Sequence, residues 1–288
     1  MRTLLLLCFC ISLLACTQQQ SEKNHEQSEK EHEDIYSSIE FPQFQSILDS
    51  AQVEGSILIL DLHDKKFYSN NFDWASEGRL PASTFKIANS IIALESGVVE
   101  DDSTLFPWNG QPRRMKIWEK DLIFKQAFHV SCVPCYQEVA RNIGVGRMRE
   151  YLNKFNYGDM KVDSNSIDVF WLEGESQISQ YQQIEFLKNF YQDELAISAR
   201  TKSIMSKLMV IEKNDEYILS GKTGWSIRNG HNNGWFVGYI EYKSKMYFFA
   251  TNVSPQEEFN MKMFPVIRKN VTFKALEHLR SESSSAIN

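Results

Sequence analysis

Short apolar runs bounded by turn residues occur towards both ends of the chain, whereas its middle carries hydrophobic residues at helical spacing. The run at 55–62 is followed by the turn His63-Asp64-Lys65 and by a second run at 66–69, and together they predict a hairpin. Three further runs predict strands at 217–223, 234–242 and 246–251, the last two joined by a turn at 243–245.

Hydrophobic residues three and four positions apart predict helices between these two groups of strands. Three of the helices are expected at 139–155, 182–191 and 197–210. An apolar run at 87–94 predicts a buried helix, with Pro81 shortly before it and Gly97 at its end. A last helix is expected at 259–279, where Pro265 interrupts or kinks it.

The order of these elements predicts a mixed α/β fold. We expect a central antiparallel sheet flanked by helices, in which the N-terminal hairpin rejoins the C-terminal strands, plus a mostly helical region from the middle of the chain. No repeat or linker divides residues 35–282, so we expect one domain there, followed by a C-terminal tail at 283–288.

The first residues have the pattern of a leader rather than of a folded segment. Arg2 precedes an apolar stretch at 4–14 that is too short to span a membrane as a helix, and we interpret residues 1–15 as a signal peptide. Leu13-Leu14-Ala15-Cys16 resembles the lipobox of bacterial lipoproteins. We therefore expect Cys16 to be lipidated and the exported protein to be held on the periplasmic side of a membrane. A plain secretory peptide cut near Ala15 is the alternative.

The composition of the chain limits the kinds of partner that the protein is expected to bind. Residues 17–34 are almost wholly polar, which predicts a disordered tether after Cys16. The formal net charge is −6 and no basic run occurs, so nucleic acid is not an expected partner. Two of the five cysteines, Cys132 and Cys135, fall in the predicted domain. We interpret them as a packed pair or a local disulfide, and a redox motif remains the alternative. A zinc site is not expected, since no second pair of ligands completes it. No feature indicates an oligomeric state.

A serine and a lysine three positions apart, Ser83-Thr84-Phe85-Lys86, begin the helix after Pro81. Side chains at this spacing share a helix face, so Ser83 Oγ and Lys86 Nζ can meet. To accept a proton near pH 7, Lys86 needs a pKa well below the usual value of about 10.4, and burial among apolar groups can lower it that far. The candidate walls of such a pocket are Phe85, Val133, Trp171 and Leu172.

A neutral buried amine also reacts with carbon dioxide, and the carbamate formed is an anionic base in the same place. Taken alone, Ser-x-x-Lys is more simply a helix start from which Lys86 reaches water.

The predicted strand at 217–223 leads into Lys222-Thr223-Gly224-Trp225. Its cation and hydroxyl suit the carboxylate of an anionic substrate, and Gly224 lets a ligand approach the backbone closely. The amides of Ser83 and Trp225 can then form an oxyanion hole. In this order the two motifs are typical of enzymes whose serine is acylated by a β-lactam.

The chain resembles the class D β-lactamases, or oxacillinases, of the serine penicillin-recognising superfamily, from about Phe41 to Leu279. One difference is Tyr157-Gly158-Asp159, where the family usually has Tyr-Gly-Asn. The matching motifs are Ser83-Thr84-Phe85-Lys86, Ser131-Cys132-Val133, Phe170-Trp171-Leu172-Glu173-Gly174, Lys222-Thr223-Gly224 and Arg268.

The resemblance implies that Ser83 is the acylated nucleophile and that Lys86, carboxylated on Nζ, is the general base for acylation and deacylation. Trp171 would hydrogen-bond the carbamate. The side chains that keep this pocket dry would be Phe85, Val133 and Leu172. Carbon dioxide or bicarbonate would be needed for the modification, with no organic cofactor and no metal.

The resemblance further implies that Ser131 and Lys222 relay a proton to the β-lactam nitrogen, and that Thr223 and Arg268 hold the substrate carboxylate. Penicillins of the oxacillin type would be hydrolysed. The runner-up is a sensor or penicillin-binding protein that is acylated and does not turn over; sensors of this fold follow membrane-spanning helices, and no apolar run of that length follows Cys16. A non-catalytic surface lipoprotein is a third possibility.

Overall fold

The computed structural model describes residues 36–242 and 245–285, with side chains up to 281. The predictions of a signal peptide, a lipidated Cys16 and a tether lie outside the described residues, and so does most of the predicted turn at 243–245. Among the described residues, no helix combines the length and the apolar character needed to cross a membrane.

The centre of the domain is a seven-stranded sheet in the order β1-β3-β2-β9-β8-β7-β6. All neighbouring strands are antiparallel except β1 and β3. The predicted hairpin is confirmed as β2 and β3, and β2 pairs with β9 as expected. The strands are β1 (Ser37–Glu40), β2 (Val53–Asp61), β3 (Lys66–Ser69), β6 (Val210–Lys213), β7 (Tyr217–Arg228), β8 (His231–Tyr242) and β9 (Lys245–Pro255), and a separate pair is formed by β4 (Leu105–Phe106) and β5 (Leu122–Ile123).

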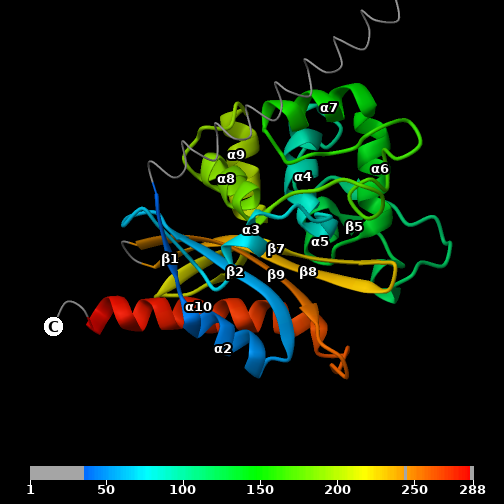
Figure 1. Cartoon of the computed structure of the whole chain (residues 1–288). Coiled ribbons are helices and arrows are strands. Elements are labelled where there is room, and N and C mark those ends of the chain that lie inside the picture. Colours follow the sequence, from blue (N-terminus) through cyan, green and yellow to red (C-terminus); the bar gives the residue numbers. More distant parts are fainter. Residues whose placement is uncertain (1–35, 243–244, 286–288) are drawn as a thin grey trace, which may run out of the picture.

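Helices cover both faces of this sheet. Figure 1 shows α2 and α10 on one face and the helices of the middle of the chain on the other. The helices are α2 (Pro42–Ser50), α3 (Phe72–Ser76), α4 (Lys86–Glu95), α5 (Phe124–His129), α6 (Val133–Ile143), α7 (Val145–Lys154), α8 (Gln180–Tyr191), α9 (Ala199–Leu208) and α10 (Phe264–Ser285), with 3₁₀ turns η1 (Ala82–Phe85) and η2 (Lys116–Trp118).

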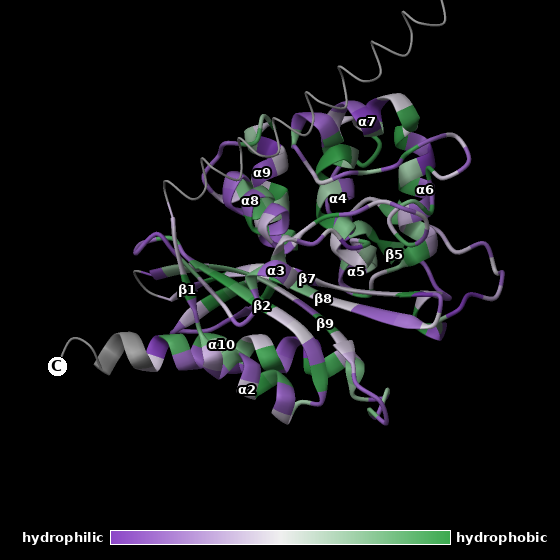
Figure 2. Cartoon of the chain, in the orientation of Figure 1, coloured by the Kyte–Doolittle hydropathy of each residue, from purple (hydrophilic) through white to green (hydrophobic). Residues whose placement is uncertain are grey.

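The sheet separates two hydrophobic cores because side chains alternate between its faces. In β9, Phe248 and Ala250 join the core under the middle helices, whereas Phe249 and Val253 join the core under α2 and α10. Figure 2 shows the matching pattern on α10, where hydrophobic and hydrophilic residues alternate along the helix. Both faces of the central strands are therefore buried, which fixes β7 between two packed layers.

Two helix predictions are wrong in detail. The helix expected at 139–155 is two helices, because Gly144 has a φ of 79°, a left-handed conformation that ends α6 and lets α7 start in a new direction. Pro265 does not interrupt a helix. Helix α10 begins at Phe264, so the proline occupies the first turn, where its missing N–H would have had no helical partner anyway. The helix continues to Ser285, past the predicted end.

Candidate active site

Ser83 lies in the 3₁₀ turn η1, and Lys86 is the first residue of α4. The two side chains meet as their spacing predicts, with Lys86 Nζ 3.0 Å from Ser83 Oγ. Ala82 before them has a φ of 50°, a left-handed conformation that is uncommon for a residue with a Cβ atom. Two hydrogen bonds anchor the sharp turn that carries Ser83. Leu80 O accepts them from Asn233 Nδ2 and Trp235 Nε1, each at 2.8 Å.

Lys86 is fully buried, and its surroundings oppose a charge. Loss of hydration holds the pKa of Lys86 well below its usual range, and the nearby Lys222 lowers it further. The described residues place no carboxylate in an ion pair with it. Both effects favour the neutral amine over the ammonium form, as is required of a lysine that accepts a proton from the neighbouring hydroxyl.

Aromatic rings pack around Phe85, the residue directly before this lysine. Phe85 is buried among Tyr157, Phe170 and Trp171, and its ring stacks on Trp171 with centroids 5.2 Å apart. Trp171 is also fully buried, yet its Nε1 has no hydrogen-bond partner among the described residues. An unpaired buried donor is costly, so this N–H is suited to an acceptor in the pocket. Val133 and Leu172 are partly buried and pack against the same core.

A second lysine–serine pair stands beside the first. Lys222 Nζ donates hydrogen bonds to Ser131 Oγ and, at 3.0 Å, to Thr223 O. Burial, with a smaller effect of Arg268, lowers the pKa of Lys222 to about 7. Ser131 is held in the left-handed region at a φ of 52°. Because its pKa is close to neutral pH, Lys222 can release or take up a proton through the hydroxyl to which it is hydrogen-bonded.

Strand β7 places Thr223, Gly224 and Trp225 beside η1. A Cβ atom on Gly224 would lie 3.0 Å from Pro81 O and 3.1 Å from Thr84 Cγ2. The missing side chain therefore lets the turn that carries Ser83 lie against the strand. Close approach of a ligand to Gly224 stays a prediction.

Arg268 lies under this strand in α10. Its guanidinium donates to the carbonyl oxygens of Gly224 and Pro265, and its Nε donates to Phe264 O at 3.1 Å. Burial lowers the pKa of Arg268 to about 10, so it is charged at neutral pH. The structure therefore brings the predicted residues of both motifs together around η1 and β7.

Known proteins are similar to this chain in sequence and in fold. Residues 22–269 match the family model of the penicillin binding protein transpeptidase domain. The β-lactamase OXA-10 of Pseudomonas aeruginosa is 40% identical over 228 residues, covering 78% of this chain and 84% of that protein. The crystal structure of the class D β-lactamase YbXI from Nostoc is 40% identical with a TM-score of 0.76, covering 81% of this chain and 98% of that one. The class D β-lactamase from Sebaldella termitidis is 37% identical with a TM-score of 0.80, covering 85% and 98%.

The chain belongs to the class D β-lactamases. It is a serine enzyme of the class that hydrolyses β-lactams.

In this class D β-lactamase, Asp159, which stands where the family usually has Asn, is a surface residue. Its carboxylate forms an ion pair with Lys161 at 2.7 Å, and its backbone pairs with Gln177. Cys132 and Cys135 form a disulfide, which is one of the outcomes left open by the sequence.

Tyr136 is a pocket residue that the sequence analysis missed. Its ring centroid lies 5.1 Å from Lys86 Nζ, and its hydroxyl pairs with Ser90 Oγ at 2.8 Å. Tyr136 follows Val133 by one helical turn. That spacing was the available signal, but the predicted helix began after it.

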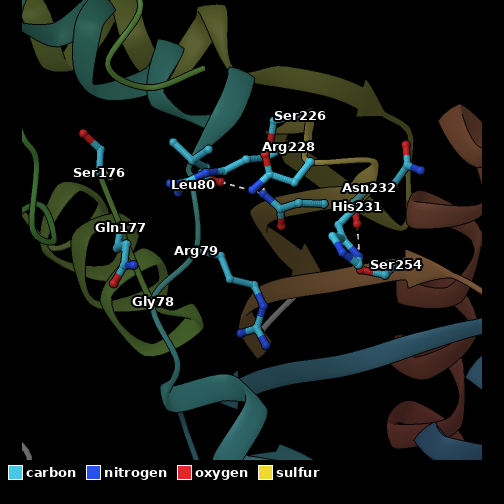
Figure 3. A pocket seen from close by; sticks show the side chains of 12 residues that line it. Gly78, Arg79, Leu80, Ser176, Gln177, Ser226, Arg228, His231, Asn232 and Ser254 are labelled. Carbon is cyan, nitrogen blue, oxygen red and sulfur yellow. Dashed lines mark hydrogen bonds between the residues drawn. The ribbon is translucent and has the colours of Figure 1, made fainter. Parts of the chain in front are cut away.

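A cavity of about 320 Å³ lies apart from these motifs, between the segment before η1 and the β7–β8 hairpin. Figure 3 shows Arg79 and Gln177 on one side and Arg228, His231 and Ser254 on the other. Neither Ser83 nor Lys222 lines it. The cavity is therefore separate from the Ser83 and Lys222 motifs at η1 and β7.

Proposed function

We propose that this enzyme opens β-lactams, including penicillins of the oxacillin type, through an acyl-enzyme on Ser83, with Lys86 carboxylated on Nζ as the general base. The observation that carries the proposal is the fully buried Lys86 at 3.0 Å from Ser83 Oγ. Class D enzymes are the relatives of this chain, which supports turnover over stable acylation.

The residues around Lys86 fit a carbamate. Carbon dioxide reacts with a neutral amine, and burial favours the neutral form of Lys86 by lowering its pKa. Trp171 Nε1, buried without a partner among the described residues, can donate to a carbamate oxygen. Addition of carbon dioxide to Nζ, with loss of one proton to solvent, would convert the neutral amine into an anionic carbamate that serves as the base. The apolar walls from Phe85, Val133 and Leu172 limit access of water to it.

Each of the remaining residues has its own role in the opening of the β-lactam ring. Ser83 Oγ attacks the lactam carbonyl after giving up its proton to the base, and the amides of Ser83 and Trp225 stabilise the oxyanion. Lys222, half protonated near pH 7, passes a proton through Ser131 to the lactam nitrogen as the bond to carbon breaks. Thr223 and the charged Arg268 attract the substrate carboxylate, Arg268 through its position beneath Gly224.

We also propose that the protein is an exported lipoprotein, anchored through Cys16 on the periplasmic side. The support is the Leu13-Leu14-Ala15-Cys16 sequence and the polar segment after it. Mass spectrometry of the processed chain tests this directly. A lipid mass on an N-terminal Cys16 is expected, and an unmodified chain beginning near residue 16 would mean ordinary secretion.

Turnover of nitrocefin by the purified protein tests the enzymatic proposal. Many turnovers per molecule are expected. A single stoichiometric burst would indicate the sensor or penicillin-binding alternative, and no reaction would indicate a scaffold without activity. Isotope-labelled bicarbonate should add a carbamate carbon signal to wild-type protein and not to Lys86→Ala.

A further inference from the structure

The turn between α5 and α6 and the first turn of α6 together carry three groups of the site within six residues. Ser131 bonds Lys222, Val133 packs against the core that holds Trp171, and Tyr136 faces Lys86. The disulfide joins the residue between Ser131 and Val133 to the residue just before Tyr136. Cys132 and Cys135 are both buried, at 0% and 2% exposure. The cross-link is therefore built into the catalytic turn rather than added at the surface.

This turn needs an external restraint. Ser131 has a φ of 52°, a strained conformation for a residue with a Cβ atom, and such a conformation persists only where the surrounding structure imposes it. Two backbone hydrogen bonds help, from Ser131 N to Phe128 O and from Cys132 N to Ala127 O. The side chain of Ser131 contributes its contact with Lys222, which has to loosen when the proton moves.

The helix start is also weakly capped. Cys132 is the N-cap of α6, and its Sγ accepts the Cys135 N–H at 3.3 Å. Sulfur is a weak acceptor compared with the oxygen of the Ser, Thr, Asp or Asn that usually occupies this position. The covalent bond holds the same two residues at a fixed separation, a restraint that a capping hydrogen bond alone does not give.

We propose that the Cys132–Cys135 disulfide is a positioning element for Ser131 and Val133, so that full β-lactam turnover requires this pair to be oxidised. The inference rests on the proposed function of Ser131. Reduction by a dithiol such as dithiothreitol breaks the S–S bond, and two electrons and two protons pass to the cysteines while the reagent closes to its cyclic disulfide. The helix start then depends on the weak cap alone.

Two double variants of the full chain separate the covalent bond from the cap. C132A/C135A removes both, whereas C132S/C135A restores a strong N-cap oxygen without the bond. We expect both to lose about 10–100-fold in kcat, because displacement of a catalytic group by about 1 Å costs on that order. KM should change by less than about threefold. The alkaline limb of the pH–rate profile should move to higher pH, because better hydration raises the pKa of Lys222, the proton donor.

Ile143→Ala, at the far end of α6, is the control for lost stability and should keep kcat near the wild-type value below its unfolding temperature. Wild-type protein treated with dithiothreitol, in urea just below its unfolding transition, should lose kcat in proportion to the two thiols gained per chain. Wild-type kcat in C132S/C135A, or in fully reduced wild type, overturns the proposal. Failure of the oxidised wild type to turn over nitrocefin would instead contradict the proposed function.

Discussion

The indole of Trp171 stacks on the ring of Phe85 with 29° between their planes, and Phe85 is the residue directly before Lys86. The stacking fixes the buried Nε1 of Trp171 with no partner among the described residues. A packed ring cannot turn away to find another acceptor. The pair therefore keeps one buried N–H available, and the proposed carbamate on Lys86 is the acceptor that we expect for it.

Replacement of Trp171 by Phe keeps the stacked ring and removes the donor. We expect the concentration of bicarbonate needed for half-maximal activity to rise by about tenfold, equivalent to the loss of one hydrogen bond to a charged acceptor. Steady-state nitrocefin rates over a bicarbonate series measure this. Trp74→Phe, whose Nε1 bonds Asn252 Oδ1 instead, is the matched control and should leave the bicarbonate dependence unchanged.

Replacement of Lys86 by Ala removes the base and leaves Ser83. The expected loss in kcat is about 10²–10⁴-fold, the usual contribution of a positioned base. A covalent adduct should accumulate, and mass spectrometry of protein mixed with a penicillin detects it. Unchanged steady-state hydrolysis would exclude Lys86 from the reaction.

The pH dependence of stability reports on Lys222. Its pKa is about 7 in the folded protein and about 10.5 when unfolded, so the unfolded chain binds the extra proton between these values. The free energy of unfolding should therefore rise with pH across that window, by up to about 1.4 kcal/mol per pH unit, and the gain is lost as pH falls to 7. Denaturant titrations from about pH 7 to about pH 9.5 test this. Lys222→Met should show a shallower rise, and an equal slope in both proteins would contradict the assignment.

Gly224→Ala should disturb η1. The new Cβ would contact Pro81 and Thr84, so the turn that carries Ser83 has to move. We expect a loss of about 1–3 kcal/mol in stability, as for other overpacked sites, and a fall in kcat. Gly146→Ala is the control, because a Cβ atom at that position would have no neighbouring atom within 4 Å, so the substitution should be neutral or stabilising. Calorimetry and nitrocefin kinetics on both variants distinguish them.

The sequence predicts the strands well where apolar runs end in clear turns, as at β2 and β3. It also places Ser83 and Lys86 together, because helical spacing brings them onto one face. It fails at Gly144, since the hydrophobic spacing continues across the break. It misses Tyr136 and the packing of Gly224 against Thr84, because contacts between elements far apart in the chain leave no local pattern.

Strand β2 pairs on one edge with β3, which follows it directly, and on the other edge with β9, at the other end of the chain. One edge of the first long strand to be synthesised therefore remains unpaired until the ribosome has made almost the whole polypeptide. Pairing of such distant segments is slow compared with local helix formation. A translocation channel that accepts only unfolded polypeptide would have that interval in which to engage the chain before the sheet closes.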